Sequence, residues 1–103
     1  MIVKHFPNSF RETELLDYLN ENKISELMIA GMMTHMCIDS TTRAAKDLGF
    51  ICTLAGDACA TRNLEINGEK VQAADVHNAF LSALNSTYAT IVSTHDYLAQ
   101  QLI

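Results

Sequence analysis

The sequence predicts an α/β domain in which helices cover both faces of a mostly parallel, Rossmann-like sheet, giving three layers. Short apolar runs alternate with amphipathic segments along the whole chain. Strands that are buried on both faces have this continuous apolar composition. The 103 residues, 49% hydrophobic and 18% charged, suit one globular domain, residues 1–103. Ligands of open parallel sheets bind beyond the carboxyl ends of the strands, so a site is expected at that edge.

Four strands and four helices are expected in alternation. The strands are predicted at residues 1–4, 27–30, 50–55 and 89–92. The helices are predicted at residues 10–22, 37–48, 72–85 and 94–102, from apolar residues that recur at helical spacing. A polar surface loop is expected at 59–70, with a turn at Asn67-Gly68.

Capping residues set the expected ends of these helices. Ser9 with Glu12, and Ser93 with Asp96, have the spacing of capping boxes. Gly49 is expected to close the second helix as a left-handed C-cap. Gly56 and Asp57 are expected to end the third strand.

Composition excludes several classes of function. A net charge of −5 and seven scattered basic residues argue against nucleic-acid binding, which needs clustered Lys and Arg. No apolar run reaches membrane-spanning length and no signal peptide is evident, so a cytoplasmic protein without membrane contact is expected. The three cysteines form no CxxC pair, which favours reduced thiols.

The segment from Glu26 to Gly49 carries the strongest chemical signal. An apolar run ends at Gly31, a tight loop follows, and Cys37 then lies where a helix should begin. The positive end of the helix dipole and free backbone N–H groups favour a thiolate there. The same N–H groups could hold the oxyanion formed when a thiolate attacks a carbonyl. Cys37 could equally be a buried residue that only fills space.

Several blocks resemble the isochorismatase-like cysteine hydrolases, the superfamily that includes nicotinamidases and related amidases. They include Lys4 ahead of an Asn-Ser-Phe segment, and the loop GMMTHMCIDSTTRAA at 31–45. The Gly-Asp-Ala at 56–58 and the helix DVHNAFLSAL at 75–84 follow in the same order. The resemblance covers nearly the whole chain and is specific at the level of the superfamily.

The resemblance implies a reaction and residues that carry it. Cys37 would attack an amide or related C–N bond of a small molecule and form an acyl thioester, and Lys4 would stabilise the thiolate. Met32 and Met33 match the cis peptide of the family's loop. The N–H groups of Met33 and Cys37 would form the oxyanion hole.

The sequence departs from the family pattern at its beginning. In the family, the triad Asp and the Asp/His metal site precede the Lys, whereas only Met1-Ile2-Val3, which belong to the same predicted strand, precede Lys4 in this sequence. We therefore expect an N-terminally truncated domain without metal or cofactor. The Lys4 strand should pair with residues 27–30 or leave an apolar edge open, which favours a homo-oligomer. The alternative is a catalytically incomplete family member that acts as a binding or assembly module.

Four residues are candidates for substrate binding: Phe6, Phe10, Met32 and His35. Other polar and thiol residues have structural interpretations. Asp57 could replace the missing acid, but a turn or cap role is the simpler one, and Asp39 is expected to complement the helix dipole. Cys52 is expected in the core, and His77 is expected to be a hydrogen-bonded structural residue.

Overall fold

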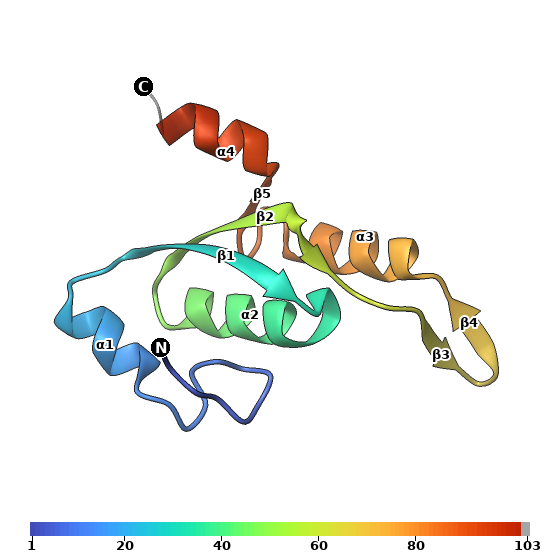
Figure 1. The fold of residues 1–103 in the computed structure, drawn as a ribbon, viewed down its shortest axis with the longest axis horizontal. Coiled ribbons are helices and arrows are strands. Elements are labelled where there is room, and N and C mark those ends of the chain that lie inside the picture. The colour runs from blue at the N-terminus through green and yellow to red at the C-terminus, as the bar shows by residue number, and fades with distance from the viewer. Residues whose placement is uncertain (102–103) are drawn as a thin grey trace.

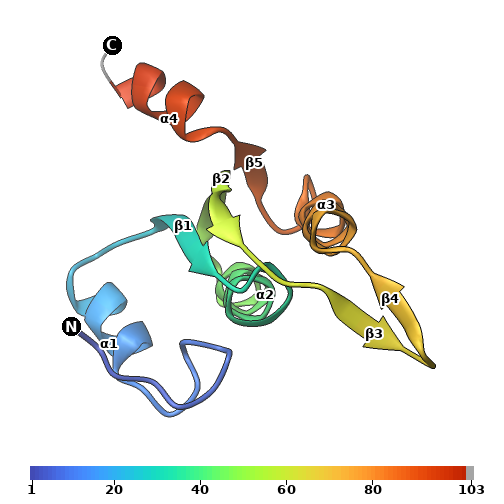
Figure 2. The ribbon, with the colours of Figure 1, turned by 45° about the vertical axis from the view of Figure 1, so that its right-hand side comes forward.

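The computed structural model describes residues 1–101. Its main sheet consists of three parallel strands in the order β1 (Glu26–Met32), β2 (Ile51–Ala60) and β5 (Thr90–Val92). Two connecting helices, α2 (Asp39–Asp47) and α3 (Ala73–Leu84), lie on one face, and α4 (Thr94–Gln101) lies on the other (Figures 1 and 2). The predicted α/β class is confirmed, with a parallel sheet and helices on both faces.

The core fills the space between the sheet and the face that carries α2 and α3. Leu27 pairs with Cys52 and Ile29 pairs with Leu54, so their side chains point to the same face. The buried core residues are Leu19, Ile38, Ala45, Phe50, Cys52, Leu54, Leu84 and Ala89. The predicted core position of Cys52 is confirmed, since only 4% of the residue is exposed.

The N-terminal segment differs from the prediction. Residues 1–4 form no strand, and α1 spans Leu15–Glu21 instead of 10–22. Glu12 has a φ of +52°, which a right-handed helix does not allow, and Ser9 makes no cap. Thr13 Oγ1 instead donates to Ser9 O at 2.6 Å. This segment is therefore a folded loop that runs beside α2 and not a strand of the sheet.

Strand β2 continues past the residues that were expected to end it. Gly56 and Asp57 lie within β2, and the pairing with β1 shifts register between Ile29 and Gly31. Beyond β2, the chain forms a two-stranded hairpin, β3 (Leu64–Ile66) and β4 (Glu69–Val71), which was not predicted. The predicted turn at Asn67-Gly68 is confirmed, because both residues have positive φ, as a two-residue hairpin turn requires.

The C-terminal end of α2 and the N-terminal end of α4 have the capping residues that the sequence predicted. Gly49 has a φ of +99°, and its N–H donates to Lys46 O while the Phe50 N–H donates to Ala45 O. These two bonds form a Schellman cap, which confirms the role of Gly49. At α4 the Asp96 N–H donates to Ser93 Oγ at 3.0 Å, as the predicted capping box requires. The predicted helix end at Leu102 lies outside the described residues.

Among residues 1–101, none of the helices combines the length and the apolar character that crossing a bilayer requires.

Candidate active site

Cys37 lies in a short π-helical turn, η1 (Thr34–Ile38), that joins the carboxyl end of β1 to α2. The Lys4 ammonium approaches it from the N-terminal segment, with Nζ 3.2 Å from Cys37 Sγ. Lys4 Nζ also donates to Phe6 O at 2.7 Å and to Pro7 O at 3.1 Å. The two carbonyls orient the ammonium toward the sulfur, so residues 33 positions apart meet in one site.

Helix α2 holds the loop that carries Lys4. Thr41 lies one helical turn after Cys37, and its Oγ1 accepts the Ser9 N–H at 3.0 Å. The same hydroxyl lies 3.2 Å from Pro7 O and 3.0 Å from Ser9 Oγ. Thr41 therefore ties the backbone beside Lys4 to the helix that follows the nucleophile. These contacts of Thr41 hold the N-terminal loop in position, although residues 1–4 do not pair with the sheet.

The loop between β1 and η1 has the backbone arrangement that the resemblance implied. The peptide bond between Met32 and Met33 is cis, and Met33 is extended, with φ −95° and ψ 150°. Met33 O then accepts the N–H groups of Met36 at 3.0 Å and of Ile38 at 3.3 Å. These bonds start the turn that presents Cys37.

A cavity of about 170 Å³ lies beside the cysteine and the lysine. It is lined by Lys4, Ser9, Ile29, Ala30, Gly31, Met32, Cys37, Ile38 and Thr41. The hydroxyls of Ser9 and Thr41 were not predicted as site residues, because Ser9 was assigned to a cap and Thr41 lay within the predicted helix 37–48. No carboxylate or imidazole is among the residues that line this cavity.

Only Met32 of the four predicted substrate-binding residues lines the cavity. The Phe10 ring stacks on Phe50 in the core, with 6.1 Å between centroids. The Arg11 guanidinium covers the Phe6 ring at 3.7 Å. His35 Nδ1 lies 2.6 Å from Thr61 Oγ1, and His35 is not among the residues that line the cavity. Phe6, Phe10 and His35 are therefore not among the residues that line this cavity, and their contribution to substrate binding stays a prediction.

Asp57 caps a helix and does not line the cavity. Its carboxylate accepts the Thr94 N–H at 2.8 Å and the Thr94 hydroxyl at 2.7 Å, at the start of α4. These two bonds, the hydroxyl above all, lower the pKa of Asp57. Asp39 is likewise engaged, in an ion pair with Arg43 at 2.9 Å. The structure thus gives both aspartates structural roles.

The other two thiols lie in environments unlike that of Cys37. Burial raises the pKa of the Cys52 thiol and also that of Cys59, whose Sγ donates to Ala55 O at 3.4 Å. A raised pKa keeps both thiols protonated near neutral pH and therefore poor nucleophiles.

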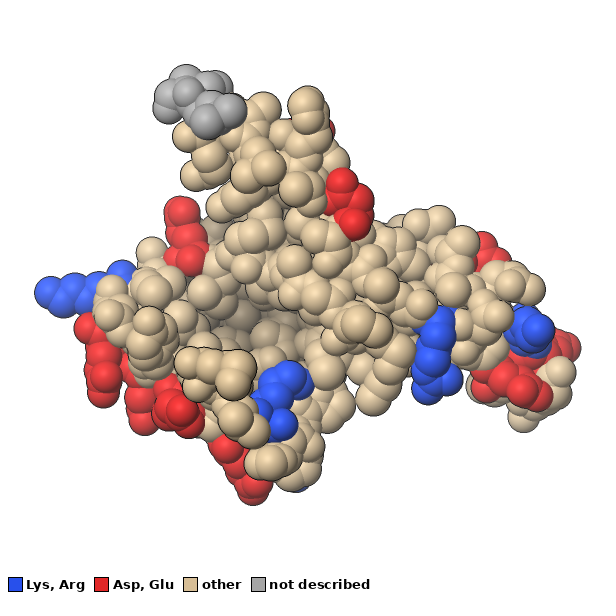
Figure 3. All heavy atoms as spheres, in the orientation of Figure 1, with Lys and Arg blue, Asp and Glu red and all other residues tan. Residues whose placement is uncertain are grey.

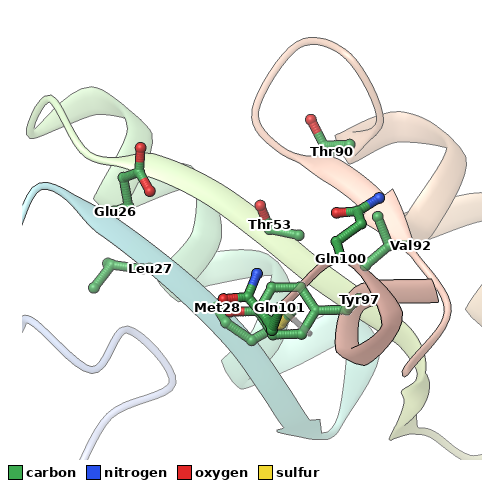
Figure 4. Close-up of a pocket in the computed structure, with 9 residues that line it drawn as sticks. All are labelled: Glu26, Leu27, Met28, Thr53, Thr90, Val92, Tyr97, Gln100 and Gln101. Atoms are coloured by element: carbon green, nitrogen blue, oxygen red, sulfur yellow. The ribbon is translucent and has the colours of Figure 1, made fainter. Parts of the chain in front are cut away.

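A second hollow, of about 380 Å³, lies on the opposite face of the sheet beneath α4 (Figure 4). Glu26, Thr53 and Tyr97 are among the residues around it, but neither Cys37 nor Lys4 is. It contains no thiol or imidazole, so the nucleophile chemistry belongs to the smaller cavity. The face viewed in Figure 3 is also hollowed near β1, and a basic side chain lies at the lower rim of that hollow. Acidic side chains gather instead over α1 and at the hairpin.

Comparison with known proteins assigns the chain to a family. The model of the isochorismatase domain matches residues 1–96. The chain belongs to the isochorismatase family. The resemblance rested on Lys4 and on the loop at 31–45. In the structure, Lys4 contacts Cys37, which lies within that loop.

The isochorismatase family protein YddQ of Bacillus subtilis is 49% identical over 98 residues, which are 95% of this chain and 54% of that protein. The nicotinamidase of Escherichia coli is 29% identical over 93 residues, which are 89% of this chain and 40% of that protein. A solved isochorismatase structure from Pseudomonas putida superposes with a TM-score of 0.89 at 35% identity, covering 92% of this chain and 49% of the other. The chain spans about half the length of the relatives it matches.

Proposed function

We propose that this chain is a cysteine hydrolase that cleaves an amide or related C–N bond of a small molecule. The contact between Lys4 Nζ and Cys37 Sγ, at 3.2 Å beside a cavity, is the observation that carries the proposal. An ammonium at hydrogen-bond distance stabilises a thiolate, which is the nucleophilic form of cysteine. The similarity to the E. coli nicotinamidase supports an amide as the substrate class.

The proposed reaction has two stages. In the first, Cys37 Sγ bonds to the carbonyl carbon, and the electron pair of the C=O moves onto oxygen. The N–H groups of Met33 and Cys37 are assigned to that oxyanion. The carbonyl re-forms and the C–N bond breaks as the Lys4 ammonium gives a proton to the leaving amine. In the second stage, water gives a proton to the Lys4 amine as its oxygen attacks the acyl carbon. The C–S bond then breaks, which releases the acid and restores the thiolate and the ammonium.

The alternative is a binding or assembly module that keeps the fold without turnover. One observation favours it: among the described residues, no carboxylate or imidazole lines the cavity to take a proton from water. Removing one member of a catalytic unit generally removes most of the activity. The reactivity of Cys37 and the turnover of an amide by the chain therefore need separate experiments.

Selective alkylation tests the nucleophile. Iodoacetamide at pH 7 should label Cys37 at least about tenfold faster than Cys52 or Cys59, because of the three sulfurs only that of Cys37 lies at hydrogen-bond distance from an ammonium. Peptide mass spectrometry measures the three rates in one sample. Lys4→Met should slow the labelling of Cys37, whereas Lys70→Met, on the exposed hairpin, should not. Equal rates at the three cysteines would disprove an activated Cys37.

Turnover of small primary amides, beginning with nicotinamide, separates the two functions. We expect ammonia release that disappears in Cys37→Ala and persists in Cys52→Ala. Fast labelling of Cys37 without release of ammonia from any amide in the panel would favour the binding module.

A further inference from the structure

We propose that His77 is a positioning residue for the nucleophile, and that it acts through Thr34. This inference rests on the proposed function, since the position of Cys37 matters only if Cys37 reacts. His77 lies on α3, far along the chain from the nucleophile loop, and is not among the residues that line the cavity.

The contact that carries the inference is a hydrogen bond between two side chains. His77 Nδ1 lies 2.9 Å from Thr34 Oγ1. Thr34 is fully buried, with 0% of its surface exposed, and is the first residue of η1, three positions before Cys37. A buried hydroxyl without a partner is costly, so the bond fixes the side chain of Thr34 against α3.

Thr34 is fixed on its backbone side as well. Its carbonyl accepts the Asp39 N–H, which closes the π-helical turn around Cys37. One residue thus connects α3 to the turn that sets the direction of the Cys37 side chain. Moving Thr34 would move Cys37 relative to Lys4, whose ammonium is held separately by Phe6 O and Pro7 O.

The next residue of the loop is held by the same helix. The His35 ring packs edge-on against Phe80, with centroids 6.0 Å apart, and Phe80 follows His77 by about one helical turn. His35 Nδ1 also bonds Thr61 Oγ1. Two adjacent loop residues therefore rest on one face of α3. Among the described residues, both imidazoles use Nδ1 to bond a threonine hydroxyl, and neither is hydrogen-bonded to Cys37.

The test compares isosteric and conservative variants by their Cys37 alkylation rate. Thr34→Val keeps the shape but removes the hydroxyl, and Thr34→Ser keeps the hydroxyl. His77→Leu removes the ring nitrogen, and Asn78→Leu is the matched control on the exposed side of α3. Loss of one hydrogen bond, about 1 kcal/mol, corresponds to roughly a fivefold change in rate.

We expect Thr34→Val and His77→Leu to slow Cys37 labelling by about fivefold, and Thr34→Ser and Asn78→Leu to stay within about twofold of wild type. The double variant Thr34→Val/His77→Leu should be no slower than either single variant, because both remove the same bond. Cys52, which is buried, serves as an internal probe of the fold in every sample.

Two results would overturn the inference. If Thr34→Val and His77→Leu label Cys37 as fast as wild type, the bond does not position the nucleophile. If Cys52 becomes reactive in both variants, the bond stabilises the fold as a whole. Failure of the proposed function is distinguishable from both, because wild-type Cys37 would then label no faster than Cys59.

Discussion

At the residue scale, the site depends on two side chains that the sequence separates and the fold joins. Cys37 was a candidate nucleophile from its surroundings alone, because an apolar run, a glycine and a helix signal surround it, and the resemblance to the family selected it over a buried structural cysteine. Lys4 could not be recognised from its surroundings. A lysine in a loop is usually solvated, and only the resemblance to the family selected it. Its three contacts, with two carbonyls and one sulfur, appear only in three dimensions.

Asp57 gives a pH dependence whose sign follows from its hydrogen bonds. Bonds from Thr94 lower its pKa in the folded state below the value of about 3.9 in an unfolded chain. The charged carboxylate therefore stabilises the fold above about pH 4, and this contribution is lost as the pH falls through the folded value. We expect Asp57→Asn to lower the urea midpoint at pH 7 and to match wild type more closely at pH 3.

Urea unfolding of Glu65→Gln is the control, because Glu65 is exposed on the hairpin. It should change the midpoint little at either pH. An Asp57→Asn difference of the same size at pH 7 and pH 3 would contradict the assignment of Asp57 as a charged cap.

At the scale of elements, local sequence patterns located most of the helices. They did not predict features that depend on packing between distant segments, such as the extent of β2. The Schellman bonds at Gly49 and the cap at Ser93 involve neighbouring residues, so the sequence shows them. Gly56-Asp57 looked like a turn, yet both residues continue β2. A strand continues through a glycine when neighbouring elements pack closely there, and that closeness is a tertiary property.

Gly56 lies at a crowded point between β2, α3 and β5, where we expect an added methyl group to be unfavourable. A Cβ there would lie 3.1 Å from Leu81 Cδ1 and 3.3 Å from Ile91 Cγ2. Gly56→Ala should therefore destabilise the fold by about 1–3 kcal/mol, the usual cost of overpacking. A thermal melt of the two proteins measures it.

Shortening Leu81 should relieve this strain. The combined cost of Gly56→Ala and Leu81→Val should be smaller than the sum of the two single costs, because the two groups compete for one space. Additive costs, or a Gly56→Ala protein as stable as wild type, would contradict the crowding.

At the scale of the whole molecule, the chain is open for its size. Its radius of gyration is 14.4 Å, against about 13 Å for a compact domain of this length. Its accessible surface is 6837 Å², roughly 1,000 Å² more than a compact monomer of 11.4 kDa exposes. Within the described residues, the outer edge of β1 has no strand partner, and Met32 at its end is 66% exposed.

This open edge predicts self-association. The excess surface is comparable to the roughly 800 Å² that each partner buries in a standard interface, and unpaired apolar edges favour pairing with another chain. We expect light scattering coupled to size exclusion to give at least a dimer. Met28→Lys, beside that edge, should shift the mass toward the monomer.

Ile66→Lys is the matched control, because Ile66 is 65% exposed on the hairpin, away from β1. A monomeric wild-type chain at micromolar concentration would contradict the prediction. An equal response to both lysines would indicate general surface attraction instead of an interface at β1.

The sequence by itself determined the α/β class, the family and the place of Cys37 between a strand and a helix, because these depend on periodicity, turn residues and local motifs. The tertiary structure decided how Lys4 reaches the sulfur without a strand, how far β2 extends, and that Ser9 and Thr41 face the cavity while Phe6, Phe10 and His35 do not. The physical reason is that these outcomes depend on contacts between distant segments. A hydroxyl or a ring has several partners within local reach, and only the packed chain selects one of them.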